Sequence, residues 1–389
     1  MQIKPPLFSA VNRARLFLSL CLLLPALAGN AVTKLVPTPP TINARAWLLV
    51  DYNSNRVLAE HNSHQRVEPA SLTKMMTAYV VLSEIRKGAV KLDDKVLISE
   101  KAWRMKGSKM FVRVNTRVSV DDLLHGMVVQ SGNDASVALA EHVAGSEDAF
   151  AQLMNIQAQR LGMKDSHFVN STGWPAAKHY STAHDLAILA RALIHDFPKH
   201  YNWYREKELT YNNIRQHNRN RLLWIDNRVD GIKTGHTESA GYCLVASALQ
   251  NKMRLISVVL GTKSDNSRSS NSRKLLNYGF RFYETFLLHK ANEPLTTMHV
   301  WKGAHQTLPL GVQQDLFITL PRGLRNKVKA NMTLETRLMA PVNKGQQYGS
   351  VNIMLSGKQI TKRPLVALQD ISEGGVWRKL VDNVKLMFQ

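Results

Sequence analysis

The chain first becomes regularly patterned near position 43, where apolar segments alternate with short turns. Residues 46–52 are mostly apolar, and residues 56–59 resume the pattern after the polar turn 53–55, which predicts a β-hairpin. A helical pattern starts at Pro69, because the first turn of a helix does not need the N–H that proline lacks. Apolar side chains then recur at helical spacing: Met75, Met76, Tyr79, Val80, Leu82 and Ile85.

A block of helices is expected next. Residues 119–122 resemble a capping box, in which side chains satisfy free N–H groups of a first helical turn, and they open a helix over 123–129. Further helices are predicted over about 134–143 and after two capping residues, Ser146 and Thr182. This block separates the first hairpin from the next group of strands.

The strand pattern then returns. Apolar runs at 240–249 and 253–260, joined by a polar turn, predict an antiparallel hairpin, and residues 273–288 predict a closing helix. Strands from both ends of residues 43–288 therefore build one sheet around the inserted helices. The predicted fold class is α/β (α+β): an antiparallel sheet flanked by helices, with a helical subdomain.

The pattern of apolar and polar positions changes toward the end of the chain. Short apolar runs between turns predict a small all-β, sandwich-like domain over residues 292–371. Residues 374–389 predict a basic amphipathic helix that can lie in a bilayer interface, and the alternative is packing on the β domain. The glycines at 374 and 375 loosen the connection and favour the membrane. On a helical wheel the apolar residues fall within about 140°: Val376, Trp377, Leu380, Val381, Val384, Met387 and Phe388.

The first 28 residues predict a secretory signal peptide. Three cations within residues 1–15 precede an apolar run over 16–27, and small residues at 26 and 28 provide a cleavage site. The run is too short for a confident membrane span, and an uncleaved anchor is the alternative interpretation. Residues 29–42 are rich in Pro and Thr and are expected to form a linker. The protein is therefore predicted to be exported.

Composition narrows the possible partners. The 389 residues carry a formal net charge of +22, which suits anionic lipid head groups and acidic polymers. Nucleic acid is not a predicted partner, because the sequence shows neither an aromatic-rich RNA motif nor zinc-finger spacing. Of the two cysteines, Cys21 lies in the predicted signal peptide, which leaves Cys243 without a disulfide partner. The histidines at 61–64 and 195–200 match no zinc hydrolase signature, so no metal and no other cofactor is predicted.

The candidate chemistry starts from Ser71 and Lys74. Residues three apart on a helix have neighbouring side chains, which places a hydroxyl nucleophile beside an amine that can serve as its base. The amine must first lose its proton, which requires burial or a second cation nearby. A Ser-x-x-Lys match alone is expected by chance about once or twice in a chain of this size.

Two further motifs strengthen this prediction. Ser131-Gly132-Asn133 lies between two predicted helices, and Lys233-Thr234-Gly235 opens the second strand region. Alone, the first is typical of a plain loop and helix cap, and the second of a plain turn. In this order and in these contexts, the three motifs form the combination found in penicillin-binding proteins and class A β-lactamases.

The chain resembles the D-alanyl-D-alanine carboxypeptidases of the low-molecular-mass penicillin-binding protein 5/6 type. Gly at the centre of the middle motif is typical of that branch, and the resemblance continues through residues 217–224, 229–237 and 279–284. The family usually has Gly where Arg221 stands. The resemblance covers nearly the whole chain and implies the penicillin-recognising serine transferase fold.

This resemblance implies a role for each catalytic residue. Ser71 attacks the carbonyl between the two terminal D-alanines of a peptidoglycan stem peptide, and Lys74, neutralised by burial and by Lys233, takes its proton. Ser131 passes a proton toward the leaving D-alanine, and Asn133 orients Lys74 and the peptide amide. β-Lactam antibiotics are expected to acylate the same serine as covalent inhibitors.

The resemblance also implies how the substrate is bound. Lys233 and Thr234 lie where its terminal carboxylate needs a cation and a hydroxyl donor, and Gly235 lets its backbone approach the strand closely. The backbone N–H groups of His236 and of the nucleophile would hold the oxyanion. Arg268 either helps to bind the carboxylate or is a solvated loop arginine, and both interpretations stay open.

Other functions remain open as well. A class A-like β-lactamase usually has Glu four residues before an Asn that follows the second motif, whereas Ser166 stands four residues before Asn170. A cell-wall-binding scaffold with secondary catalysis is an alternative from another class, and endopeptidase activity on cross-links is a third. The favoured interpretation is a periplasmic serine carboxypeptidase that is peripherally attached to the inner membrane.

Overall fold

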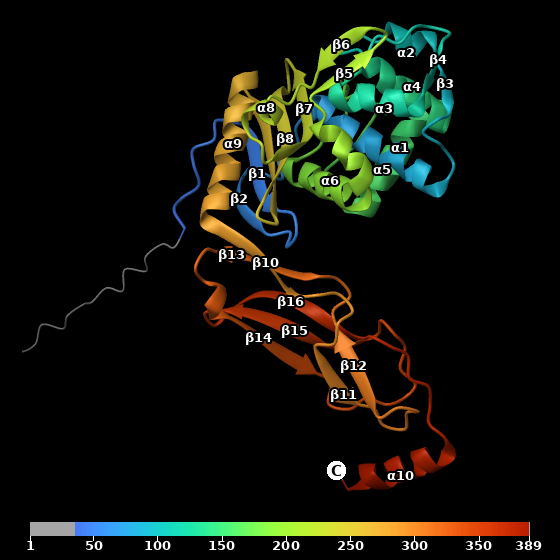
Figure 1. Ribbon diagram of the computed structural model, residues 1–389, viewed down its shortest axis with the longest axis vertical. Helices are drawn as coiled ribbons and strands as arrows, with labels where there is room; N and C mark the ends of the chain where they lie inside the picture. The colour runs from blue at the N-terminus through green and yellow to red at the C-terminus, as the bar shows by residue number, and fades with distance from the viewer. Residues whose placement is uncertain (1–35, 389) are drawn as a thin grey trace, which may run out of the picture. The chain divides into compact units, whose positions relative to one another are not determined.

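The computed structural model describes residues 36–388, so the predicted signal peptide and the first half of the predicted linker lie outside the described residues. Its central element is a five-stranded antiparallel sheet with the strand order β2-β1-β9-β8-β7 (Figure 1). Early and late strands share this sheet, which confirms the prediction. The strands are β1 (Ala46–Asp51), β2 (Val57–His61), β7 (Val229–Thr237), β8 (Gly241–Gln250) and β9 (Met253–Thr262).

Helices cover both faces of this sheet. α9 (Asp265–Phe282) lies along one face, and the helical block lies against the other, with α6 (Ala183–Asp196) in contact with the strands (Figure 1). Because both faces are covered, β8 and β9 are apolar along most of their length, as strands buried on both sides are. Val245 and Val258, which are paired across these two strands, are fully buried.

The helical block contains the capped helices that the sequence predicts. Ser119, Ser146 and Thr182 each accept a hydrogen bond from the backbone N–H three residues further on, as N-caps do. Two short pairs of antiparallel strands, β3–β4 and β5–β6, border the block. Its elements besides α6 are α1 (Lys74–Lys87), α2 (Glu100–Arg104), α3 (Val120–Val129), α4 (Asn133–Ala144), α5 (Glu147–Leu161), α7 (Pro198–Tyr201), α8 (Leu222–Ile225), β3 (Lys95–Leu97), β4 (Arg117–Ser119), β5 (Glu208–Tyr211) and β6 (Ile214–His217).

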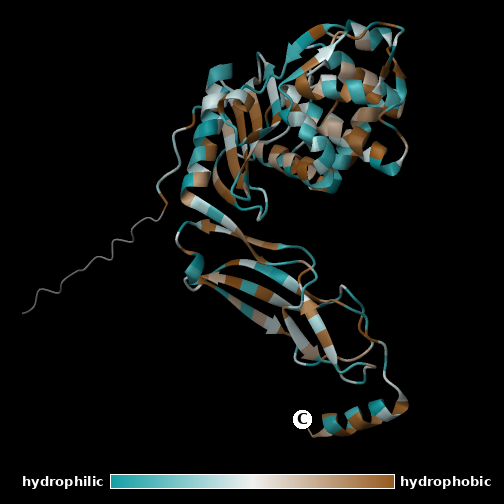
Figure 2. Ribbon diagram, viewed as in Figure 1, coloured by the Kyte–Doolittle hydropathy of each residue, from teal (hydrophilic) through white to brown (hydrophobic). Residues whose placement is uncertain are grey.

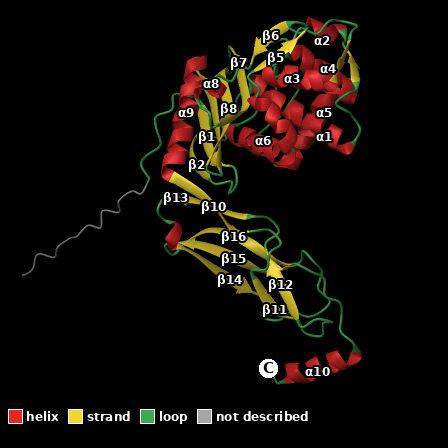
Figure 3. Ribbon diagram, in the orientation of Figure 1, coloured by secondary structure: helices red, strands yellow, loops and turns green. Residues whose placement is uncertain are grey.

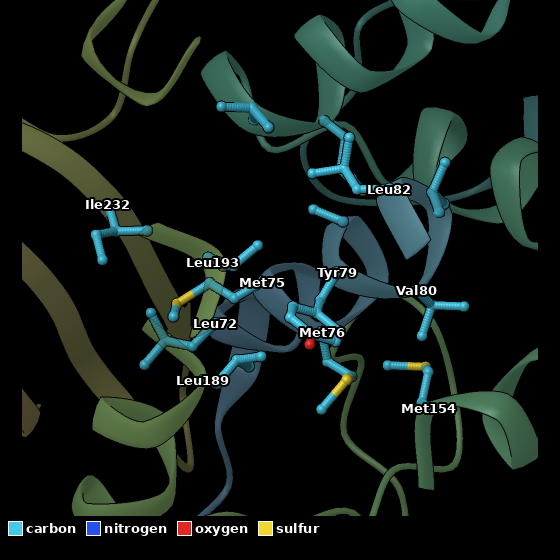
Figure 4. Close-up of a cluster of buried hydrophobic side chains, with 14 of the residues drawn as sticks. Leu72, Met75, Met76, Tyr79, Val80, Leu82, Met154, Leu189, Leu193 and Ile232 are labelled. Carbon is cyan, nitrogen blue, oxygen red and sulfur yellow. The ribbon is translucent and has the colours of Figure 1, made fainter. Parts of the chain in front are cut away.

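The helix α1 lies in the centre of the main hydrophobic core. Its side chains from residue 74 to residue 83 are all buried. Figure 4 shows the apolar side chains of this segment gathered with Leu189 and Leu193 of α6 and with Met154 of α5. Close packing of this kind holds the backbone of a helix in one position. The residues at its N-terminal end are therefore fixed relative to the sheet.

The closing helix differs from its prediction. The pattern predicts a helix over 273–288, but α9 begins at Asp265 and ends at Phe282. Ser264 caps it by accepting a hydrogen bond of 3.1 Å from the N–H of Ser267. The strand β10 (Tyr283–His289) follows directly and pairs with β13 (Leu316–Pro321).

The chain beyond residue 283 forms the predicted sandwich-like β domain, and Figure 3 shows that strands dominate it. The β10–β13 pair and a second sheet, with the order β11-β12-β16-β15-β14, share one core. Ile318 from the first and Ile353 from the second are among its buried members. The second sheet consists of β11 (Thr296–His299), β12 (Thr307–Gly311), β14 (Val328–Leu334), β15 (Gln347–Leu355) and β16 (Lys358–Ala367).

The last described element is the predicted amphipathic helix, α10 (Val376–Met387). Its apolar side chains are exposed: Trp377 at 80% and Phe388, just beyond the helix, at 87%. Figure 2 shows the alternation of hydrophobic and hydrophilic residues along it. Asp382 is the one buried residue of this helix, and it accepts a hydrogen bond of 2.7 Å from the backbone N–H of Lys302. Within residues 36–388, no helix is both long enough and apolar enough to span a bilayer.

Candidate active site

Ser71 lies in a single 3-10 turn (Ala70–Thr73) that leads directly into α1. The preceding residue, Ala70, has a φ of +48°, which an L-amino acid adopts only where the surroundings enforce it. Gly173 provides part of these surroundings, because a Cβ on it would lie 1.8 Å from the carbonyl oxygen of Ala70. The turn that presents the serine is therefore shaped by a tight contact with the loop that carries Gly173.

A buried histidine supports the same turn. The side chain of Thr73 and the Nε2 of His179 lie 2.8 Å apart, and the Nδ1 of His179 accepts a hydrogen bond of 3.2 Å from the N–H of Val169. Since Nδ1 is the acceptor, Nε2 carries the proton and donates to Thr73. Burial lowers the pKa of His179 to about 4, so the ring is neutral at neutral pH. This histidine is not among the site residues that the sequence predicts, and no local motif marks it.

Lys74 is the base candidate, and only 1% of its surface is exposed. Its Nζ lies 3.1 Å from Ser71 Oγ, 2.7 Å from Asn133 Oδ1 and 2.7 Å from the carbonyl oxygen of Thr172. Burial lowers the pKa of Lys74 to about 7, and the positive charge of Arg219 contributes to this lowering. A substantial share of the amine is therefore neutral at neutral pH, which is the condition that a general base requires.

The source of the second cation differs in part from the prediction. Arg219 is the cation that lowers the pKa of Lys74, whereas the sequence predicts this role for Lys233. Lys233 is also affected: burial lowers its pKa well below the ordinary value, and the charges of Lys74, Arg219 and Arg268 lower it further. Four basic side chains therefore gather at one site, a clustering that no spacing along the sequence reveals.

The middle motif supplies one oriented amide and one free hydroxyl. Asn133 is the first residue of α4; its Oδ1 accepts from Lys74, and its Nδ2 donates to the carbonyl oxygen of Lys106 at 2.6 Å. Ser131 has a φ of +68°, and its buried Oγ has no hydrogen-bond partner among the described residues. A buried hydroxyl without a partner is rare in proteins, and its proton is available for exchange with a bound substrate.

The third motif lies on β7, one of the two outer strands of the sheet. Lys233 is 3% exposed, and its Nζ donates to the carbonyl oxygen of Thr234 at 3.2 Å. A Cβ on Gly235 would lie 3.0 Å from the carbonyl oxygen of Pro69 and 3.3 Å from the Cβ of Ala70. The close approach that the structure shows at this glycine is therefore between β7 and the turn that carries the nucleophile.

Arg268 is not a solvated loop arginine. It lies in the first turns of α9, is 6% exposed, and donates from Nη1 to the carbonyl oxygen of Gly235 at 3.1 Å. Its guanidinium also pairs with Asp265 and lies over the ring of Tyr242, which in turn stacks on exposed His236. These contacts hold the positive charge of Arg268 beside β7.

A single cavity of about 580 Å³ joins most of the predicted residues. Ser71, Ser131, Asn133, Thr234, Gly235, His236 and Arg268 line it, whereas Lys74 and Lys233 lie buried beneath its surface. Several lining residues are not among those that the sequence predicts as site residues: Trp174, Arg219, Thr237, Tyr242 and Asp265.

The residues that bear on the alternatives lie elsewhere. Ser166 bonds to Ser181 and Asp185, and the side chain of Asn170 bonds within its own loop, so neither lines the cavity. The histidines considered for a metal have other partners: His61 stacks on Trp47, His64 lies against His184, His200 lies edge-on to Trp203, and His195 pairs with Asp196. Within the part of the chain that the structure describes, no group of three or more His, Cys, Asp or Glu residues is arranged to hold a metal ion.

The fold and this cavity together place the chain among the penicillin-recognising serine enzymes. Comparison with known families is more specific. Residues 33–264 match the family model of D-alanyl-D-alanine carboxypeptidases, and residues 283–373 match that of the C-terminal domain of penicillin-binding protein 5. The chain therefore belongs to the D-alanyl-D-alanine carboxypeptidase family.

Individual relatives agree with this assignment. The chain is 46% identical over 365 residues to D-alanyl-D-alanine carboxypeptidase DacA of Escherichia coli K12, which covers 92% of this chain and 91% of that protein. It is 47% identical over 357 residues to DacC of the same organism, covering 90% and 89%. Among solved structures, penicillin-binding protein 5 from Haemophilus influenzae is similar with a TM-score of 0.83 and 45% identity, over 87% of this chain and all of that one. The predicted serine carboxypeptidase class and fold are confirmed.

Proposed function

We propose that the chain removes the terminal D-alanine from peptidoglycan stem peptides through an acyl-enzyme on Ser71. The observation that carries the proposal is the contact of 3.1 Å between Ser71 Oγ and a buried lysine whose pKa is lowered to about 7. Neutral Lys74 takes the hydroxyl proton while Oγ attacks the carbonyl carbon of the scissile amide. This step forms a tetrahedral intermediate and a protonated Lys74.

Collapse of that intermediate breaks the C–N bond. The leaving nitrogen of D-alanine needs a proton, and the buried hydroxyl of Ser131, which has no other partner among the described residues, is the candidate to deliver it while taking a replacement proton from protonated Lys74. Asn133 holds Lys74 in place through Oδ1 during this exchange. Water then attacks the ester on Ser71, which releases the shortened peptide and restores the hydroxyl. A β-lactam would acylate Ser71 in the same way, but its leaving group stays tethered to the acyl chain.

The substrate is held by the cationic side of the cavity. Arg268, buried Lys233 and the hydroxyl of Thr234 are the candidates that bind its terminal carboxylate. Since β7 is an outer strand, its free backbone groups can pair with an extended peptide. The backbone N–H groups of Ser71 and His236 are the proposed oxyanion donors.

Released D-alanine tests this proposal directly. The purified chain, incubated with a pentapeptide that ends in D-Ala-D-Ala, is expected to release one D-alanine per peptide, and Ser71→Ala is expected to release none. Ser270→Ala is a matched control, because Ser270 is an exposed serine outside the cavity. Absence of D-alanine release by the unaltered chain would refute the proposed reaction.

We further propose that the chain is exported and attached peripherally to the inner membrane. The support is a signal-like N-terminus, which lies outside the described residues, together with the exposed apolar side chains of α10 and the basic residues beside them. Vesicles that contain anionic lipid should bind the chain, and Trp377→Ser should weaken that binding. The matched control is Trp103→Ser, another exposed tryptophan on a different helix. Equal binding of both variants would contradict the role of α10.

The domain limits also stay a prediction: a signal peptide to residue 28, a linker to 42, a catalytic domain over 43–288, a β domain over 292–371 and the terminal helix. Limited proteolysis tests them, because cleavage is expected first in the exposed segments between folded units.

A further inference from the structure

A shallow groove continues the active-site cavity beyond Arg268. Three arginines and one acid are among the described residues that line it: Arg219, Arg221, Arg268 and Asp265. Arg219, Asp265 and Arg268 also line the active-site cavity, so the two spaces share a wall. Of the described residues around either space, Asp265 is the one carboxylate.

This carboxylate is an obstacle to the proposed substrate. Asp265 pairs with the guanidinium of Arg268, the group that is proposed to bind the terminal carboxylate of the peptide. Two negative charges beside one arginine repel each other, so an uncompensated Asp265 would weaken the binding of any anion at that position. A cation that neutralises Asp265 without filling the substrate site must therefore contact this carboxylate from outside the active-site cavity.

Arg221 meets this requirement. Its Nη1 lies 3.4 Å from Asp265 Oδ2 and 2.8 Å from Asn266 Oδ1, on the side of the carboxylate that does not contact Arg268. The residue has ordinary helical angles (φ −61°, ψ −20°), and the buried Leu222 that follows fixes its backbone. The arginine thus fits a position where the family usually has Gly without straining the turn.

We propose that Arg221 is a positioning residue for substrate recognition: it neutralises Asp265 and thereby leaves the charge of Arg268 available to the terminal carboxylate of the stem peptide. This inference rests on the proposed carboxylate site. Arg221 acts through Asp265 rather than by touching the peptide, so its effect falls on substrate binding and not on the acylation chemistry.

Steady-state kinetics with two substrates test this inference. One substrate is a peptide that ends in D-Ala-D-Ala, and the other is the same peptide with a C-terminal amide, which lacks the negative charge. Because the Arg221–Asp265 pair is partly exposed, Arg221→Gln is expected to raise the KM of the acid by only about 3- to 10-fold, with kcat retained. The KM of the amide should not change, and Arg221→Lys should behave like the unaltered chain.

Asp265→Asn is a further variant in this kinetic experiment. Alone it is expected to lower the KM of the acid, and combined with Arg221→Gln it should return that KM to the starting value or below. Arg215→Gln is the matched control, since Arg215 is an exposed arginine that pairs with Glu208 outside both spaces and should leave all constants unchanged.

The outcomes separate this inference from the proposal beneath it. If the unaltered chain binds acid and amide equally well, the carboxylate site itself is wrong, and this inference falls with it. If it prefers the acid, but Arg221→Gln changes both substrates alike or neither, Arg221 has only a structural role or none. A double variant that stays as weak as Arg221→Gln would also overturn the inference, because Asp265 would then not mediate the effect.

Discussion

The pKa of Lys74 gives the sharpest prediction, and Asn133→Asp perturbs it directly. A lysine with the usual pKa of 10.5 is neutral in about one molecule in 3000 at pH 7, whereas a pKa of about 7 leaves about half of the molecules neutral. The environment of Lys74 therefore raises the supply of free base about 1500-fold at this pH.

Asn133→Asp replaces the amide oxygen that lies 2.7 Å from Nζ with a carboxylate of nearly the same shape. An opposite charge at this distance favours the ammonium form and should raise the pKa of Lys74 by about 1 to 3 units. Because the base is neutral above its pKa, the rise of the acylation rate with pH should move to higher pH by the same amount. At pH 7 the variant is expected to react about 5- to 500-fold more slowly, and it should recover much of its rate in alkaline buffer.

The assay is the second-order rate of acylation by a fluorescent penicillin from pH 5 to pH 10. Asn133→Ala is the control, because it removes the same hydrogen bond to Lys74 without adding a charge, and its profile should not move to higher pH. If Asn133→Asp lowers the rate by one factor at every pH, Asn133 only orients the substrate, and the reasoning about the base is refuted.

Three further predictions concern stability. Lys74→Met should raise the Tm at pH 7. Between about pH 7 and pH 10.5 the unaltered chain should gain stability and the variant should not, because the unfolded state of the unaltered chain binds a proton that its folded state has lost. Equal dependence of Tm on pH in the two proteins would contradict this. Gly173→Ala should destabilise the chain by more than about 2 kcal/mol and abolish acylation, because the new methyl group meets the carbonyl of Ala70. Gly162→Ala, which also has a φ of +81° but open space around it, should cost only about 1 kcal/mol in a denaturant titration. Asp134→Ala should cost about 3 kcal/mol or more, because this carboxylate accepts hydrogen bonds from three consecutive backbone N–H groups at positions 110–112; a loss below about 1 kcal/mol would show that water replaces it.

The predictable parts of the fold are those that local patterns determine. The capping residues Ser119, Ser146 and Thr182 satisfy backbone groups within one turn, so the sequence alone locates those helix starts. The start of the closing helix, in contrast, could not be located from a local pattern. Its first half buries polar side chains, among them Arg268 and Asn271, because it borders the active-site cavity and the chain near residue 43. Hydrophobic periodicity cannot detect a helix whose buried face is polar.

The end of that helix was missed for a different reason. Residues 283–288 alternate with an apolar content that suits a helix or a strand, and the pairing of β10 with β13 decides between them. Contacts between residues this far apart in sequence leave no local signal.

The candidate site divides in the same way. Each of the three motifs is a short contiguous stretch of sequence, so Ser71, Lys74 and the residues of the other two motifs could be predicted. Arg219 and Asp265 could not, because their importance comes from distances across the cavity. Arg268 was an open alternative, and its burial in α9 assigns it to the cavity.

The central claim is that Ser71, activated by Lys74, forms an acyl-enzyme with a D-Ala-D-Ala peptide. Rapid acid quenching followed by mass spectrometry of the digested protein tests it most directly. The account predicts an adduct on the fragment that contains Ser71, with the mass of the substrate's acyl group without its terminal D-alanine, and a matching amount of free D-alanine. An adduct on Ser131 or on any other residue, or release of D-alanine with no adduct at any quench time, would contradict it.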